Sequence, residues 1–116
     1  MRHLRQSEIA LVERLLEMAE KPPQLYKPLC EVMVYDLDDG GMGSIQFCNE
    51  MPAQDRWFGY SAVDCFYNTA QQSVSIGLYA DQAGEIYELD VFTGTGEPLQ
   101  QEFDPSFELQ RSVVIQ

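Results

Sequence analysis

The spacing of apolar residues changes once along the chain, and this change limits the folds that are open to it. Apolar side chains recur at helical spacing in residues 7–20, where Ser7 can cap the first turn and Pro22 and Pro23 end the pattern. From Leu29 onward the period is close to two, with β-branched and aromatic residues interrupted by Gly, Asn and Asp. One helix followed by several strands predicts an α+β fold.

Turn residues divide the second part of the chain into five expected strands. These strands cover residues 30–37, 42–49, 60–67, 72–80 and 85–92. We expect an antiparallel meander with the helix on one face, because a lone helix and a one-sided apolar sheet each need the other. Residues 93–116 are expected to form a loop-like tail, although residues 112–115 have the composition of an edge strand. The length predicts one domain over residues 1–116, with the sheet at about 30–92.

The turns also set the strand pairing that we expect. They place Leu37 opposite Met42, Tyr67 opposite Gln72, and Ala80 opposite Glu85. On the helix side, Ile9, Val12 and Leu16 are expected to be buried under the sheet. On the opposite face, these pairings align Asp64 and Asp90 in one row across Ser75, Glu88 lies beside Gly77, and Phe92 lies at the edge.

Negative charge dominates the chain and is unevenly distributed. There are 19 Asp and Glu against 7 Lys and Arg, a net charge of −12. Residues 1–27 carry +1, which leaves −13 for the rest. Such a chain repels polyanions, so we expect no nucleic acid or membrane partner and favour a basic protein. The first residues contain no uninterrupted apolar stretch, which predicts a cytoplasmic protein.

The residue types that serve catalysis and metal binding are sparse. Cys30, Cys48 and Cys65 form no C-x-x-C pair and His3 is the one histidine, so we expect three reduced, largely buried thiols. The run over residues 36–44 lacks the ligand series of an EF-hand and the Lys of a phosphate loop, and it is interpreted as a hairpin turn. We therefore expect no catalytic residue, cofactor or metal.

Three blocks of sequence are distinctive. They are R-x-L-x-x-x-E at Arg2, Leu4 and Glu8, D-G-G-M-G-S over residues 39–44, and D-x-x-G-x-I-Y-E-L-D-V-F over residues 81–92. Together they resemble a family of small, functionally uncharacterised bacterial proteins that are sometimes discussed as immunity proteins of polymorphic toxin systems. The resemblance implies a toxin-binding role and supplies no activity and no catalytic residues.

These observations predict a non-enzymatic acidic protein that binds a basic partner, such as a nuclease-type toxin. The candidate partner-binding residues are Asp39, Trp57, Asp64, Glu88, Asp90 and Phe92. Trp57 and Phe58 are also candidates for capping the core. Two alternatives remain open: a small carboxylate-dependent or metal-dependent hydrolase that uses the same acids, and an interaction domain with a structural role. A concave pocket around the acids would favour the hydrolase, whereas a flat, exposed face would favour the binder.

Overall fold

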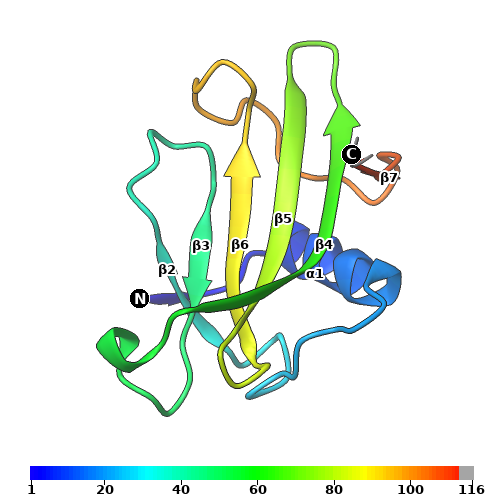
Figure 1. Cartoon of the computed structure of the whole chain (residues 1–116). Coiled ribbons are helices and arrows are strands. Elements are labelled where there is room, and N and C mark those ends of the chain that lie inside the picture. Colours follow the sequence, from blue (N-terminus) through cyan, green and yellow to red (C-terminus); the bar gives the residue numbers. More distant parts are fainter. Residues whose placement is uncertain (113–116) are drawn as a thin grey trace.

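A computed structural model describes residues 1–112 and has an α+β architecture, as predicted. One α-helix, α1 (Gln6–Met18), lies behind an antiparallel sheet in this part of the chain (Figure 1). The strands are β1 (Arg2–His3), β2 (Met33–Asp36), β3 (Ile45–Phe47), β4 (Phe58–Asn68), β5 (Ser73–Asp81), β6 (Ile86–Phe92) and β7 (Gln110–Arg111). Residues 113–116, which contain most of the predicted edge strand, lie outside the described residues.

The order of the strands differs from the predicted five-stranded meander. Seven strands within residues 1–112 are arranged β1-β2-β3-β6-β5-β4-β7. After β3 the chain crosses to the far side of the sheet, forms β4 and returns through β5 to β6, which pairs with β3 (Figure 1). This arrangement aligns Ile45 with Leu89, so the apolar faces of both hairpins join in one buried surface.

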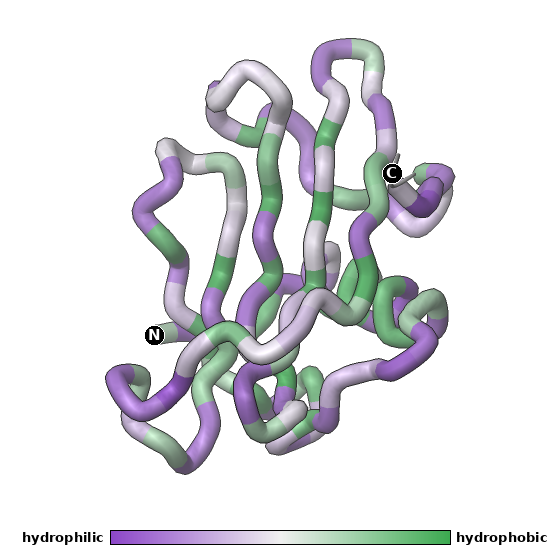
Figure 2. Tube along the Cα trace, in the orientation of Figure 1, coloured by the Kyte–Doolittle hydropathy of each residue, from purple (hydrophilic) through white to green (hydrophobic). Residues whose placement is uncertain are grey.

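Each predicted hairpin is shifted by two residues from the observed pairing. Val34 pairs with Phe47, and Leu78 pairs with Leu89. The β5–β6 hairpin shifts because its loop has three residues, ending at Gly84 with φ +84°. A bulge in β6 adds to the shift, because Ala80 pairs with Ile86 and Tyr79 pairs with Glu88. A shift of two keeps every side chain on its predicted face, and Figure 2 shows the resulting alternation along the strands.

Helix α1 begins earlier than predicted and presents a different stripe to the sheet. The Arg5 backbone N–H donates to Glu8 Oε1 at 2.7 Å, so Arg5 rather than Ser7 is the cap residue. Leu11, Val12 and Leu15 are buried, and of these three only Val12 was predicted to be buried under the sheet. The other two predicted residues, Ile9 and Leu16, are half-buried at the border of the core.

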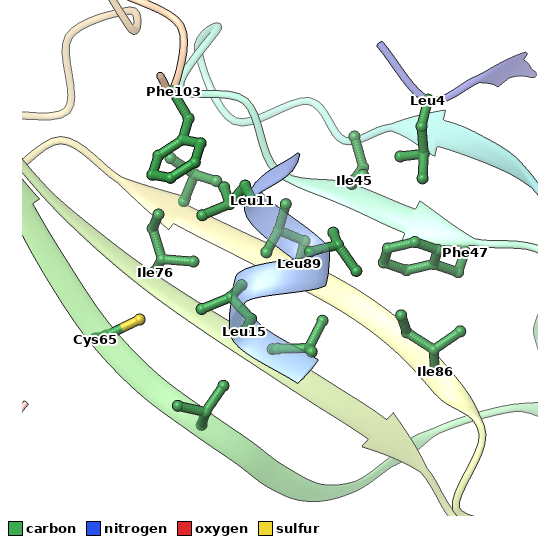
Figure 3. Packing of buried hydrophobic residues seen from close by; sticks show 14 of the residues in the cluster. Leu4, Leu11, Leu15, Ile45, Phe47, Cys65, Ile76, Ile86, Leu89 and Phe103 are labelled. Carbon is green, nitrogen blue, oxygen red and sulfur yellow. The ribbon is translucent and has the colours of Figure 1, made fainter. Parts of the chain in front are cut away.

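The core fills the space between α1 and the sheet (Figure 3). The segment after β6, which was predicted to be a loop-like tail, contributes β7 and two buried side chains, Phe103 and Leu109. Phe103 packs against Tyr67 with ring centroids 5.7 Å apart, and Phe107 lies 5.3 Å from the same Tyr67 ring. The tail therefore closes the core at the β4 edge of the sheet.

A buried ion pair joins the β3–β4 connection to the β5–β6 turn. Arg56 Nε donates to Asp81 Oδ2 at 2.9 Å, and its other nitrogens donate to the carbonyl oxygens of Phe47 and Ile86 at 2.5 and 2.8 Å. Asp81 Oδ1 accepts the turn N–H groups of residues 83 and 85. Trp57 and Phe58, the two candidates for capping the core, are 60% and 54% exposed, so the prediction of an aromatic cap is wrong for both.

The three cysteines differ in environment. Cys65 is buried in β4, and burial and the nearby charge of Asp64 raise the pKa of its thiol to about 11. Cys48 is partly buried and Cys30 is exposed, so the prediction of burial is wrong for Cys30, which lies in a turn before β2. Within residues 1–112, no helix has the length and apolar character needed to cross a membrane.

Candidate functional site

Three carboxylates gather on the face of the sheet that points away from α1, which is the face toward the viewer in Figure 1. Asp64 and Asp90 occupy one row, on either side of Gly77. Glu88 lies in the next row, opposite Tyr79. We call Asp64, Tyr79, Glu88 and Asp90 the acidic patch. The prediction placed the same three acids together, but around Ser75 rather than Gly77.

The floor of the acidic patch is Gly77, and the Tyr79 ring covers it. A Cβ atom at position 77 would lie 2.6 Å from the Tyr79 hydroxyl oxygen, so the ring can fold over this row only because residue 77 is glycine. The Tyr79 ring also contacts the Phe58 ring, which meets it edge-on with the ring centroids 5.3 Å apart. The phenol therefore lies in the row that holds Asp64 and Asp90.

The acidic patch has no compensating cation on its own strands, because β2–β6 contain neither Lys nor Arg. Burial raises the pKa of Glu88, and the charge of Asp90 raises it further. Burial also raises the pKa of Tyr79, with added contributions from the charges of Asp90, Asp64 and Glu88. Burial is the largest cause of both shifts, and the like charges of the neighbouring carboxylates add to it because they disfavour the ionised forms. An ammonium or guanidinium group at this face would relieve the repulsion.

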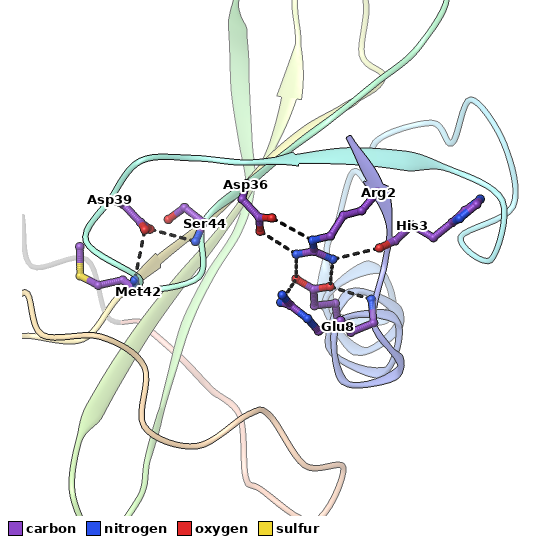
Figure 4. A network of polar contacts seen from close by, with 8 residues as sticks. Arg2, His3, Glu8, Asp36, Asp39, Met42 and Ser44 are labelled. Carbon is purple, nitrogen blue, oxygen red and sulfur yellow. Dashed lines mark hydrogen bonds and ion pairs between the residues drawn. The ribbon is translucent and has the colours of Figure 1, made fainter.

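Asp39 is connected to the acidic patch through Ser44. Its carboxylate accepts the backbone N–H groups of Met42 at 3.1 Å and Ser44 at 2.9 Å, inside the β2–β3 loop (Figure 4). The Ser44 hydroxyl lies 3.3 Å from Asp90 Oδ1 and accepts the Val91 N–H at 2.9 Å. Burial opposes ionisation of Asp39, but these hydrogen bonds hold its pKa below the usual value. Asp39 therefore organises the loop that supports Asp90.

The two candidate aromatic anchors lie at different places. Phe92 is 46% exposed and stands opposite Ser75, one row from the row of Asp64 and Asp90. Trp57 is exposed next to the β5–β6 turn, where its backbone exchanges hydrogen bonds with Gln82. The structure thus brings Phe92 to the acidic patch and leaves Trp57 at the end of the sheet.

A second charged cluster lies where β1 meets α1 and β2. Arg2 makes two hydrogen bonds to Glu8, at 2.7 and 2.8 Å, and two to Asp36, at 2.8 and 3.0 Å (Figure 4). Burial opposes ionisation of Glu8, yet its bonds to Arg2 and Arg5 hold its pKa below the usual value. Opposite charges are matched here, so this cluster fastens the N-terminal strand and helix rather than offering a binding surface.

The acidic patch differs in geometry from a metal centre and from an enclosed pocket. Among residues 1–112, no group of three or more His, Cys, Asp and Glu side chains is placed to hold a metal ion. Four cavities in this part of the chain are lined by other residues, and none of the four is lined by Asp64, Glu88 or Asp90. Asp64 is exposed, and Glu88 and Asp90 are half-buried on the sheet face.

Sequence reasoning did not identify Tyr79 and Ser44. Strand alternation places Tyr79 on the same face as Gly77, and a glycine two residues before a tyrosine is the signal that was available. Ser44 belongs to the D-G-G-M-G-S block, but its bond to Asp90 depends on the pairing of β3 with β6, which no local pattern indicates.

Comparison with known proteins gives one match. No curated protein and no solved structure matches the chain. Residues 1–102 match a family described as a domain of unknown function, DUF6984, and this match covers β1 through β6 and the start of the tail. The chain therefore belongs to the DUF6984 family.

Proposed function

We propose that this protein is a non-enzymatic binder of a basic protein, that it works in the cytoplasm, and that the acidic patch is its docking surface. The observation that carries the proposal is the grouping of Asp64, Glu88 and Asp90 on one open face whose strands hold no cation. The raised pKa of Glu88 supports it, because the charge of Asp90 adds to the effect of burial, and an approaching positive group would relieve this repulsion.

The surroundings of the acids suit Lys and Arg side chains. Tyr79 and the half-exposed Phe92 provide aromatic surface beside the carboxylates, and cations stack favourably on such rings. An arginine there would combine bidentate hydrogen bonds to a carboxylate with stacking on a ring. The net charge of −12 adds long-range attraction, which speeds the encounter with a basic partner.

Neutralising a basic toxin is the specific form of this function that we propose. The sequence resemblance to proteins discussed as immunity proteins suggests it, and a strongly acidic surface matches the basic active-site region of a nuclease-type toxin. Binding in this form blocks the toxin sterically and electrostatically and requires no chemistry from the acidic protein.

A carboxylate-dependent hydrolase is the second candidate, and one observation favours it. Glu88, with its raised pKa, is a neighbour of Asp90 along β6, and pairs of carboxyl groups with separated pKa values serve as general acid and base. The open geometry favours the binder, because hydrolases enclose their reacting groups in a concave site.

Affinity capture from the native host with three baits tests the proposal. The baits are the wild-type protein, the double variant Glu88→Gln/Asp90→Asn, and the control Glu20→Gln/Glu31→Gln, which removes the same charge from exposed positions outside the strands. We expect a basic protein that the wild type and the control retain and the acidic-patch variant loses. An acidic captured partner, or equal retention by all three baits, would refute the proposal. Hydrolytic turnover that Glu88→Gln abolishes would favour the second candidate.

A further inference from the structure

A wide, open cavity lies on the side of the helix, away from the acidic patch. It is a groove of about 490 Å³ between α1 and the loop of residues 25–30. Its apolar lining comes from Ile9 and Leu16 on the helix and from Leu25 and Leu29 on the loop. Leu25 is 41% exposed, and the two helix residues are half-buried. An apolar strip is therefore left accessible to solvent here.

The spacing of the helix residues defines what can fill the groove. Ile9 and Leu16 are seven residues apart, so they mark two turns of one stripe, about 10.5 Å along the axis of α1. This is the spacing that the apolar ridge of a second helix presents at positions i, i+3 or i+4, and i+7. The groove volume accommodates a few side chains but not a helix body, so a partner helix would lie on the surface with its apolar side chains inserted.

The rim of the groove is negatively charged. Glu13 and Glu17 are exposed, line the groove and stand one turn apart, about 6 Å along the helix. Two nearby cations contact other groups. The Lys27 ammonium lies 5.5 Å from the centre of the Tyr26 ring and lines another cavity. Arg14 donates a hydrogen bond to the carbonyl oxygen of Pro105. The rim therefore complements Lys or Arg side chains spaced by four residues on a partner.

We infer that this groove is a second interaction surface, and that its occupant is a basic amphipathic helix of another protein. The partner helix inserts an apolar i, i+3/i+4, i+7 ridge between α1 and the loop of residues 25–30. Its Lys or Arg residues, four positions apart, pair with Glu13 and Glu17. The inference does not depend on the acidic patch, because the groove and the patch belong to opposite faces of the molecule.

A synthetic peptide of about 15 residues tests the inference, with Leu at the ridge positions and Lys at the flanking positions. Its affinity for the full chain is measured by fluorescence anisotropy, and amide chemical shifts locate the binding site. We expect saturable binding that perturbs α1 and the loop of residues 25–30. Glu13→Gln/Glu17→Gln should weaken binding about fivefold, and Leu25→Ser about tenfold. All three positions are exposed, so thermal melts should show that both variants remain folded.

The matched control is Glu88→Gln/Asp90→Asn, which removes the same charge from the acidic patch and should change the peptide affinity less than twofold. An equal loss in this control would overturn the inference and assign the binding to the patch. Equally strong binding of a peptide with Glu in place of Lys would overturn the basic character of the occupant. No saturable binding up to about 1 mM peptide, or self-association of the chain that Leu25→Ser abolishes, would also overturn it.

Discussion

Replacing Asp81 with Asn should remove much of the stability of the protein. The substitution keeps the shape of the side chain but leaves the guanidinium of Arg56, whose side chain is 2% exposed, without its counter-charge. Breaking a buried pair by neutralising one partner costs about 3–5 kcal/mol, because the remaining charge is neither solvated nor balanced. The carbonyl oxygens of Phe47 and Ile86 still accept from Arg56, so we expect the lower half of that range. Urea denaturation followed by circular dichroism measures the change in the free energy of unfolding.

The exposed Asp38→Asn substitution is the control, since it makes the same charge change and should alter stability by less than about 0.5 kcal/mol. In a double-mutant cycle with Arg56→Met, the cost of Asp81→Asn should fall by at least about 1 kcal/mol, because no buried cation remains. A cost for Asp81→Asn below about 1 kcal/mol in the wild-type background would refute the assignment of this pair as a buried electrostatic link.

Three further predictions concern the core and the charged clusters. Leu89→Ala should cost about 2–5 kcal/mol of unfolding free energy in urea melts, because Leu89 is fully buried against the helix; a loss below about 1 kcal/mol would contradict the packing. Arg2→Gln should cost about 1–2 kcal/mol at neutral pH. Because the pKa values of Glu8 and Asp36 are lowered in the fold, the difference should shrink as pH falls below the usual carboxyl range and vanish only once both carboxylates are protonated in the folded protein. Glu88→Gln should be neutral or stabilising at pH 7, because the raised pKa of Glu88 beside Asp90 means that its ionisation opposes folding as pH rises; a clear loss of stability would contradict this sign.

The side-chain faces of the strands could be predicted from the sequence, but the pairings could not. Alternation places Val34, Leu78 and Leu89 toward the helix, and all three are buried. The pairing depends on loop geometry, which varies by one or two residues at similar composition. Ala70 and Gln71 form a shorter turn than expected, because the Thr69 hydroxyl accepts two backbone N–H groups. A shift of two residues in a strand pairing leaves each side chain on the same face of the sheet. The pattern of apolar residues therefore cannot distinguish the predicted pairing from the observed one.

The strand order and the tail depend on long-range contacts. The connection from β3 to β4 is held in place by the hydrogen bonds of Arg56 to Asp81 and Ile86. These partners lie 25 and 30 positions further along the chain, so no local signal reveals them. Phe103 and Leu109 sit in a segment with the turn residues of a loop, and they are buried because they meet Tyr67 and the β4 edge. A composition rich in Gly and Pro predicts loop geometry correctly but does not exclude burial of single aromatic side chains.

The candidate site was predictable as a group of residues but not in its detailed structure. Alternation and charge bring Asp64, Glu88 and Asp90 to one face, and the structure places them there. Two of the three sequence blocks that carry the family resemblance contain residues with structural roles. Arg2 links the N-terminal strand to the helix, and Asp39 holds the β2–β3 loop. Capping and ion-pair roles of this kind require the folded geometry, because their partners lie on separate elements.

The central claim, that the acidic patch docks a basic protein, is tested most directly by the rate of association with the captured partner. Stopped-flow measurements over about 0.05–0.5 M salt compare the wild type, Glu88→Gln/Asp90→Asn and the control Glu20→Gln/Glu31→Gln. The account predicts that the acidic-patch variant associates more slowly at low salt and shows a flatter salt dependence, while the control stays close to the wild type. Identical association rates and salt dependence for the wild type and the acidic-patch variant would contradict it.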